Sequence, residues 1–303
     1  SALFMQDRDN SANYKQIAAT KPSLLLEGET PRLIDEWAEA PVLWDAVRYT
    51  VDMRGDVGQF ILTGSAVPKD VTDDENLKEE EKRMHSGVGR IAPMRMRTMS
   101  LWESKESNGK VSLASLFEGD ADVAAISDLT IEGLAYATCR GGWPASTKLK
   151  EKAALRVARN YVEEVINYDV HRVDGVDKNT TRVRKLLESY ARNISTMAAN
   201  ETIMADVRAT DQTISPNTFA IYLSALRRIF IVDDVPAWSP ALRSKTKIRT
   251  SPKRHFVDPS IAVALMGTNP QGLLKDFPTF GFLFEDLCAR DLRVYAQALD
   301  GEV

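Results

Sequence analysis

Two adjacent carboxylates and two hydroxyl side chains are the residues best suited to chemistry in this chain. Asp35 and Glu36 directly follow the apolar pair Leu33-Ile34, and Thr63 and Ser65 end a second apolar run further along. A carboxylate at a strand end can hold Mg²⁺, and a second one beside it can polarise an attacking water molecule. A hydroxyl at the end of the next strand could sense a phosphate and orient that water. The alternative is a helix N-terminus with solvated acids, which the pattern alone does not exclude.

Alternating strands and helices are predicted to position these side chains. Apolar runs at 3–5, 33–34 and 59–62 predict strands, and helices are predicted at 14–19 and from Pro41 onward. Strands that are separated by helices and end in polar groups predict a parallel α/β sheet with its site at the carboxyl ends of the strands. Composition and alternation further predict a solvated acidic loop or exposed helix over 69–83 and an edge strand over 94–99.

A second, mainly helical region is predicted to begin near residue 127. Within this region, three helices and a strand follow one another over the roughly 55 residues from 178 to 232, which is the layout of a winged-helix module. A further helix is predicted to begin at Gly281 and to run to about residue 298. The other predicted elements of this region are helices at 146–168, 178–199, 201–207 and 217–228, the last with Ser215 as its N-cap, and a strand at 229–232.

Basic residues gather just after this predicted module. Residues 243–254 contain six basic side chains and no acidic one. With the helix at 217–228 they could contact a DNA backbone, which would give non-specific, salt-sensitive binding. The alternative is a solvated basic loop beside an internally packed helix, because winged-helix modules also serve as protein contacts. The candidate DNA-binding residues are Thr218, Arg227, Arg243, Lys245, Lys247 and Arg249.

The composition is that of an ordinary globular protein of two or three domains. The 303 residues include 43 acidic and 39 basic side chains, for a formal net charge of −4. Nucleic acid could therefore bind only through a local basic patch. Two cysteines cannot form a disulfide framework, and no run approaches the roughly 20 apolar residues of a membrane span. Residues 1–10 lack the features of a secretory signal, so a cytoplasmic protein without a membrane partner is expected.

Seven short motifs follow one another along the chain, at Pro31–Trp37, Pro41–Arg48, Gly58–Ser65, His85–Arg90, Met99–Ser104, Arg140–Pro144 and Phe256–Ser260. Their types and order closely resemble a bacterial and archaeal family of AAA-type P-loop ATPases whose members carry a C-terminal domain of unknown function numbered 4143. The resemblance extends over nearly the whole chain, and the combined order of the motifs is specific.

The resemblance implies both a fold and a nucleotide site. The implied α/β fold is a P-loop NTPase-like parallel sheet over 1–126, a mainly helical, winged-helix-like module over 127–270, and the start of a PD-(D/E)XK nuclease-like domain over 271–303. The implied cofactors of the full-length family are ATP and Mg²⁺. Asp35, on Mg²⁺ through water, and Glu36 match the Walker B carboxylates, and Thr63 or Ser65 matches the polar sensor position.

Further residues match other functional positions of the family. Arg90 falls where such ATPases carry a trans-acting arginine or a sensor, a role that would require a homo-oligomer or another neighbouring subunit. Arg95 and Arg97 could do the same, although basic residues on an edge strand also discourage unwanted pairing. Glu285 matches a metal-assisting glutamate in the first helix of nuclease-like folds. The remaining nuclease residues would follow Val303, so no nuclease chemistry is expected here.

One departure from the family bears on activity. No G-x-x-x-x-G-K-[ST] loop occurs in the 303 residues, and the family places that loop before the strand at 3–5. The expectation is a chain that lacks the first strand and phosphate loop and binds ATP weakly or not at all. The predicted function is nucleotide hydrolysis coupled to a C-terminal module that could bind DNA. The alternative is a DNA- or protein-binding regulator in which the α/β domain is a scaffold.

Overall fold

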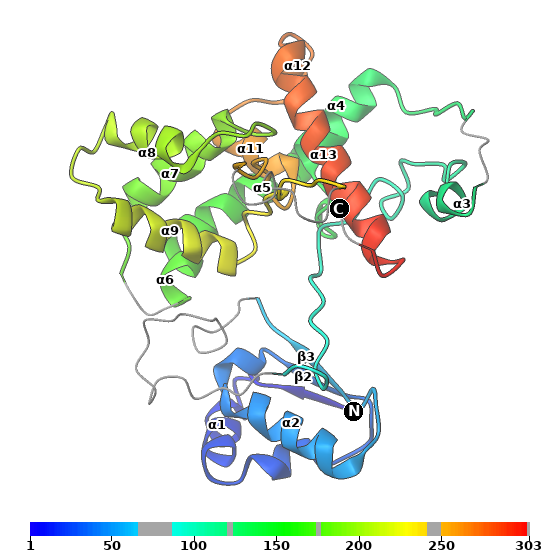
Figure 1. Cartoon of the computed structure of the whole chain (residues 1–303), viewed down its shortest axis with the longest axis vertical. Helices are drawn as coiled ribbons and strands as arrows, with labels where there is room; N and C mark the ends of the chain where they lie inside the picture. Colours follow the sequence, from blue (N-terminus) through cyan, green and yellow to red (C-terminus); the bar gives the residue numbers. More distant parts are fainter. Residues whose placement is uncertain (66–86, 120–123, 174–176, 241–249, 302–303) are drawn as a thin grey trace. The chain divides into compact units, whose positions relative to one another are not determined.

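A computed structural model describes residues 1–65, 87–119, 124–173, 177–240 and 250–301 of the chain, without the side chain of Arg172. The chain forms two compact units. The first unit comprises Ser1–Arg95 and Val173–Gly175, and the second comprises Met96–Arg172 and Val176–Val303. The domain boundary expected near residue 126 therefore does not coincide with the division between the compact units. Figure 1 traces the elements of each unit along the sequence.

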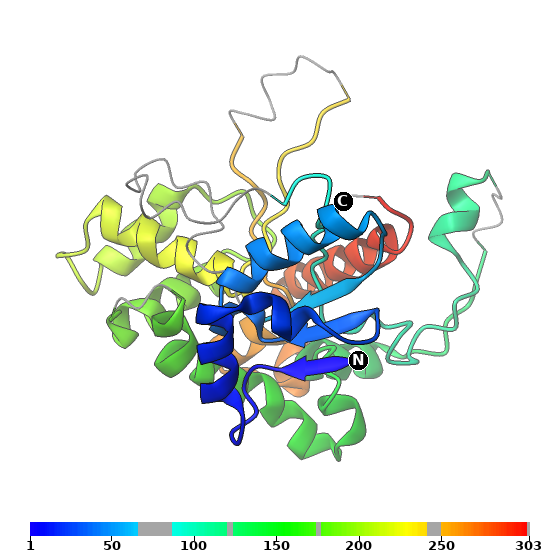
Figure 2. The same ribbon diagram turned by 90° about the horizontal axis from the view of Figure 1, so that it is seen from below.

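The first unit is built on a small parallel sheet, in agreement with the predicted α/β class. Strands β1 (Ala2–Phe4), β2 (Arg32–Asp35) and β3 (Phe60–Thr63) lie in the order β1-β2-β3. Both pairs of neighbouring strands are parallel. Figure 2 shows the three strands side by side. The helical elements of this unit are α1 (Ser11–Thr20), η1 (Pro22–Leu26), η2 (Trp37–Glu39) and α2 (Val42–Arg54).

Apolar side chains from these elements form one core. Leu3 and Ile34 point from the strands into it, and Leu43 and Val47 pack against it from α2. These two α2 residues are four positions apart, so they lie on the same face of the helix. The helix ends at Gly55, whose φ of 73° is accessible to glycine at little cost. The core therefore fixes α2 against the sheet whose carboxyl edge carries Asp35.

The second unit is helical within the described residues. Its long C-terminal helix, α13 (Phe277–Gln297), packs against α11 and α4, and α11 also packs against α5 and α7. The other helical elements are α3 (Leu113–Phe117), α4 (Ile131–Arg140), η4 (Ser146–Lys148), α5 (Glu151–Glu164), η5 (Val165–Asp169), α6 (Val170–Arg172), α7 (Thr180–Arg192), α8 (Asn200–Arg208), α9 (Pro216–Arg228), α11 (Pro259–Leu265) and α12 (Pro270–Leu273).

Two predicted strands are wrong. Residues 94–99 have irregular backbone, because this segment is held through individual contacts such as the 2.7 Å bond from the Met99 N–H to the Gly142 carbonyl. Residues 229–232 contribute only an isolated antiparallel bridge between Val232 and Phe256. Phe230 adopts a φ of 59°, which interrupts the extended backbone that a strand requires. The strand of the expected winged-helix layout is therefore absent from these residues.

The predicted helices differ from the observed ones mainly at their ends. The helix expected over 146–168 is divided into η4, α5 and the π-helical turn η5, and the helix expected over 178–199 is limited to α7. The C-terminal helix begins at Phe277 rather than Gly281, because Asp276 caps it by accepting the Thr279 N–H at 3.2 Å. Ser215 caps α9 as predicted and accepts the Thr218 N–H at 3.1 Å.

The short helix α3 differs from the other helices of the second unit in its packing. None of its residues is buried, and Phe117 is 82% exposed. Figure 1 shows α3 on a stretch of chain that extends away from the other helices of the second unit. Across the described ranges, no helix combines the length and apolar character that would let it cross a bilayer.

Candidate functional site

The ends of the three strands meet at the carboxyl edge of the sheet in the first unit. In the observed register Phe4 lies opposite Asp35, and Asp35 lies opposite Thr63. Glu36 directly follows β2, and Ser65 lies two residues after β3. Because the strands are parallel, their polar termini occupy one edge, which is where α/β sheets bind ligands. The structure thus brings together the two carboxylates and the two hydroxyl residues singled out from the sequence.

Asp35 is held by its neighbour on β3. The Thr63 hydroxyl donates a 2.6 Å hydrogen bond to Asp35 Oδ1, which orients the carboxylate. Within the described residues, no protein group binds Asp35 Oδ2. Mg²⁺ is commonly held by one or two carboxylates and several waters, so Asp35 fits such an ion. Among the described residues, no three His, Cys, Asp or Glu side chains converge as metal ligands, and an ion held by one carboxylate and water does not require that.

Glu36 lies in an unusual backbone conformation beside Asp35. Its φ of 53° and ψ of 48° are left-handed, a conformation that costs a non-glycine residue of order 1–3 kcal/mol and clusters at functional sites. Burial raises the pKa of Glu36, a Ser65 backbone N–H that donates to the carboxylate opposes the rise, and the charges of Asp35 and Glu39 add to it. A carboxylate with a raised pKa accepts a proton from water more readily than an ordinary glutamate.

Arg90 is not part of this group of side chains. Its Nε donates to Asp52 Oδ1 at 2.7 Å, and both side chains are exposed. Asp52 is in the last turn of α2. Because α2 connects the carboxyl end of β2 to the amino end of the parallel strand β3, that turn lies toward the amino ends of the strands. Within one chain, Arg90 is therefore held away from Asp35.

The predicted nuclease-like position lies on the surface of the second unit. Glu285 forms an ion pair with Lys253, and its side chain is 44% exposed. The next residue, Asp286, is fully buried and its Oδ1 lies 2.6 Å from His255 Nδ1. Burial raises the pKa of Asp286 to about 6, although the hydrogen bond from His255 lowers it. On this part of α13, the buried titratable residue is thus Asp286, which is paired with His255. The sequence did not single out either residue.

The DNA-binding candidates are only partly described. Arg243, Lys245, Lys247 and Arg249 lie outside the described residues. Thr218 Oγ1 lies 2.9 Å from Ser215 Oγ in the N-terminal cap of α9, and Arg227 Nη2 donates to Asp234 Oδ2 at 2.9 Å.

Two other residues of the segments expected to contact DNA, one on the helix at 217–228 and one in the basic run, point inward. Tyr222 is buried, and its hydroxyl accepts the Asn179 N–H at 2.9 Å. Arg254, the last residue of the basic run, is 2% exposed and binds Asp234 and Asn200. The prediction of DNA contact by these two side chains is therefore wrong, since they bind groups within the fold. The rest of the basic run stays a prediction.

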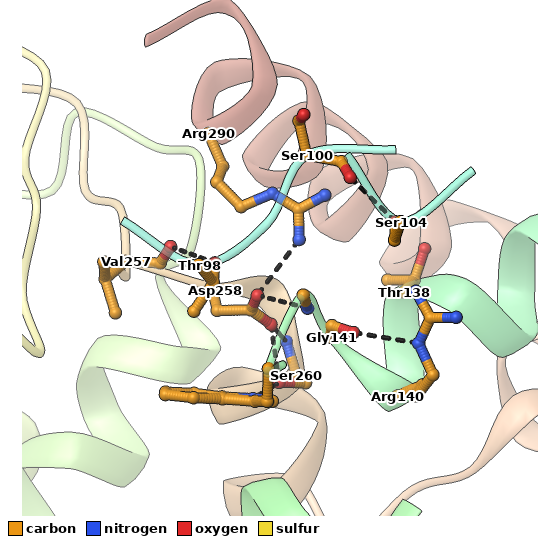
Figure 3. A network of polar contacts seen from close by, with 12 residues as sticks. Thr98, Ser100, Ser104, Thr138, Arg140, Gly141, Val257, Asp258, Ser260 and Arg290 are labelled. Carbon is orange, nitrogen blue, oxygen red and sulfur yellow. Dashed lines mark hydrogen bonds and ion pairs between the residues drawn. The ribbon is translucent and has the colours of Figure 1, made fainter. Parts of the chain in front are cut away.

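A buried polar network joins two of the sequence motifs in the second unit (Figure 3). Asp258 is fully buried at its centre and accepts the Gly142 N–H at 2.8 Å. It also accepts Arg290 Nη1 at 3.0 Å and the Ser260 hydroxyl at 2.5 Å. Burial alone would raise the pKa of Asp258, but the charge of Arg290 and these hydrogen bonds outweigh it and lower the pKa. The network holds α4, α11 and α13 together.

The segment 97–106 is bound into the same network. The Leu101 N–H donates to Asp291 Oδ2 at 3.0 Å, and Arg140 forms an ion pair with Glu106. Arg97 Nε donates to Asp233 Oδ2 at 2.9 Å. Arg97 is therefore a partly buried ion-pair residue of the second unit, and the edge-strand explanation of its charge is wrong because there is no strand here.

Sequence reasoning found half of this network. It recognised Arg140–Pro144 and Phe256–Ser260 as motifs but assigned them no role. Arg290 and Asp291 were missed, and the available signal was their place on a helix whose neighbouring residues are apolar. Two adjacent charges on such a helix need buried partners, because charged residues are rarely buried unpaired.

The comparisons with known proteins concern this second unit. A sequence model of a family described only as a domain of unknown function, DUF8612, matches residues 131–272. The matched range extends from the start of α4 into α12 and covers slightly less than half of the chain. No curated protein and no solved structure matches the chain. The chain is therefore similar to that family from α4 to α12, a range that includes Asp258 but not α13, and the comparisons name no activity.

Proposed function

We propose that the first unit is the catalytic part of a Mg²⁺-dependent ATPase of the AAA-like kind, with hydrolysis coupled to the second unit. The observation that carries the proposal is the hydrogen bond between Thr63 and Asp35 at the ends of adjacent parallel strands, with Glu36 beside them. Phosphoryl transfer to water needs charge neutralisation on the phosphate and a group that orients the attacking water. Asp35 and Glu36 supply groups suited to those two needs.

Each residue has a distinct part in this proposal. Asp35 would hold Mg²⁺ through its Oδ2 and bound water, and the ion would supply charge neutralisation for the phosphates. Thr63 fixes the Asp35 carboxylate through its hydroxyl. Glu36 orients water and accepts its proton, and the Ser65 N–H holds the Glu36 carboxylate in place.

A phosphate-binding loop is the component that the printed sequence does not contain. Such a loop follows a parallel strand and opens a helix. Within the described residues β3 pairs only with β2, so its second edge can accept another strand. A parallel strand added at that edge would place the following loop beside Thr63 and close to Asp35. In a protein that has such a loop, we therefore expect it on the β3 side of the sheet.

The test uses the natural protein in which these residues occur, and it compares Glu36→Gln with Glu27→Gln. Glu36→Gln keeps the size of the side chain but removes the proton acceptor, so we expect ATP to bind with unchanged affinity and turnover to fall by at least about 100-fold. Glu27 is an exposed residue of the same unit, and Glu27→Gln should leave turnover unchanged. Phosphate release and nucleotide binding would be measured for both variants.

Two outcomes would contradict this proposal. Hydrolysis by Glu36→Gln at the wild-type rate would remove Glu36 from the mechanism. A natural protein without any phosphate-binding loop, and without ATP-dependent phosphate release, would favour the alternative in which the α/β unit is a scaffold for a binding module.

A further inference from the structure

A polar groove lies on the surface of the second unit, within the range matched by the DUF8612 family. It has a volume of about 240 Å³ and lies between α5, α7 and the end of α11. Its walls carry two guanidinium groups and one carboxylate. The lining residues are Arg159, Val162, Glu163, Arg184, Ala264, Leu265 and Gly267.

The two arginines are incompletely paired. Arg184 Nη2 donates to Glu163 Oε2 at 2.7 Å, and this is its only ion pair within the described residues. Arg159 donates a single long hydrogen bond of 3.4 Å to the Thr268 carbonyl, and no described carboxylate pairs with it. A guanidinium group carries five N–H donors. Most of the donors in the groove are therefore unengaged by protein groups, and its lining carries two positive charges against one negative charge.

Apolar residues line the rest of the groove, and a smaller cavity adjoins it. Val162, Ala264 and Leu265 give the groove an apolar floor. A second, smaller cavity adjoins it, shares Arg159 and Ala264, and is lined in part by Cys139. Burial raises the pKa of the Cys139 thiol to about 12, while the charge of Arg159 opposes that rise. The charge of Arg159 therefore also acts on the pKa of a thiol inside the fold.

We propose that this groove binds a small phosphate-bearing anion between Arg159 and Arg184. Arginine binds phosphate through two parallel N–H···O bonds, and two such groups approaching from different helices suit a tetrahedral oxyanion better than a planar carboxylate. The volume is below the roughly 300–1,000 Å³ of sites for drug-sized ligands, which limits the ligand to a phosphate group with a short substituent. Glu163 competes with the ligand for Arg184. This inference is independent of the proposed ATPase site.

The experiment titrates the chain with inorganic phosphate, with potassium chloride at equal ionic strength as the reference. Calorimetry and the thermal midpoint of unfolding are measured for the wild type and for Arg159→Gln, Arg184→Gln and Glu163→Gln. We expect phosphate, but not chloride, to bind and to raise the midpoint. Each arginine variant should weaken binding at least about tenfold, since it removes charge-assisted hydrogen bonds to the anion. Glu163→Gln should bind phosphate more tightly than the wild type.

Arg156→Gln is the matched control, because Arg156 is exposed on α5 and does not line the groove. It should bind phosphate within about twofold of the wild type, and unchanged circular dichroism without phosphate would show that all variants are folded. Equal losses in Arg156→Gln and Arg159→Gln would show that phosphate responds only to net charge, and the proposal would then fail. It would also fail if acetate matched phosphate in affinity, or if the wild type bound neither.

Discussion

At the scale of single residues, Gly141 combines a positive φ with close packing against the buried network. Its φ is 73°, and an added Cβ would lie 2.4 Å from both Asp258 Oδ1 and Ser260 Oγ. These oxygens belong to the buried network, so neither can move away without breaking a hydrogen bond of Asp258. A side chain at this position would therefore lower the free energy of unfolding in two ways, through backbone strain and through crowding.

The variant Gly141→Ala is compared with Gly267→Ala, at a glycine that also has a positive φ but is not crowded. Gly267 has a similar φ of 66°, but nothing lies within 4 Å of its added Cβ. We expect Gly267→Ala to cost about 1–2 kcal/mol from the left-handed backbone alone. Gly141→Ala should cost about 1–3 kcal/mol more, because its ψ of 176° lies in a region that is essentially restricted to glycine and overpacking adds to that strain. Urea denaturation would measure both, and equal losses would contradict the crowding argument.

At the scale of elements, α13 carries both a surface ion pair and a buried one. Glu285 pairs with Lys253 where both side chains are substantially exposed, whereas Arg290 pairs with Asp258 and Asp291 in the interior. Exposed pairs contribute about 0–1 kcal/mol, because water screens them and side-chain entropy opposes them. Removing one member of a buried pair leaves an uncompensated charge and costs about 3–5 kcal/mol.

Two substitutions on α13 should therefore differ strongly in their effect. Glu285→Gln should change the free energy of unfolding by about 1 kcal/mol or less, and Arg290→Leu should lower it by about 3–5 kcal/mol. Denaturation followed by tryptophan fluorescence would detect the loss, since Trp143 donates to Ser260 in the same network. If Arg290→Leu does not fold, Arg290→Lys keeps the charge and should lose less stability. A larger loss in Glu285→Gln would contradict this view of the helix.

The elements also show what the sequence could and could not predict. Periodicity predicted α2, the N-cap at Ser215 predicted α9, and apolar runs predicted the three strands, because local sequence decides those elements. The failures at 94–99 and 229–232 have a common cause. Residues 94–99 alternate apolar and polar side chains and residues 229–232 form a short apolar run, and both patterns are typical of strands. Among the described residues no strand lies beside either segment, so their backbone groups bind separate partners. Such partners are distant in sequence, and periodicity carries no information about them.

The candidate site was predictable to a similar extent. Asp35 and Thr63 follow apolar runs, so their positions at the carboxyl edge came from the strand pattern alone. Arg90 could not be placed in this way, because its pairing with Asp52 depends on how the chain passes along α2. The pairing of Asp258 with Arg290 could not be predicted either, because the two residues are 32 positions apart in the sequence. Spacing identifies residues on one element, and packing between elements decides the rest.

At the scale of the whole molecule, the two units carry different parts of the proposed function. In the proposed function the carboxylates of the first unit would hold Mg²⁺ and orient water, but the printed sequence contains no phosphate-binding loop. Carboxylates alone repel the negatively charged phosphates of ATP. The backbone N–H groups and lysine of a phosphate loop normally overcome that repulsion. The 303 residues should therefore bind Mg²⁺-ATP much more weakly than a protein in which the loop is present.

The difference should be large enough to measure directly. Millimolar and micromolar dissociation constants are separated by about 4 kcal/mol, which two or three charge-assisted hydrogen bonds can supply. We expect residues 1–303 to show a dissociation constant for Mg²⁺-ATP no tighter than about 1 mM by calorimetry. A phosphate group of ATP that bound in the Arg159 groove would add to the measured heat. The titration is therefore carried out on the Arg159→Gln variant. Micromolar affinity in that variant would mean that the carboxyl edge of the sheet binds the nucleotide without the loop.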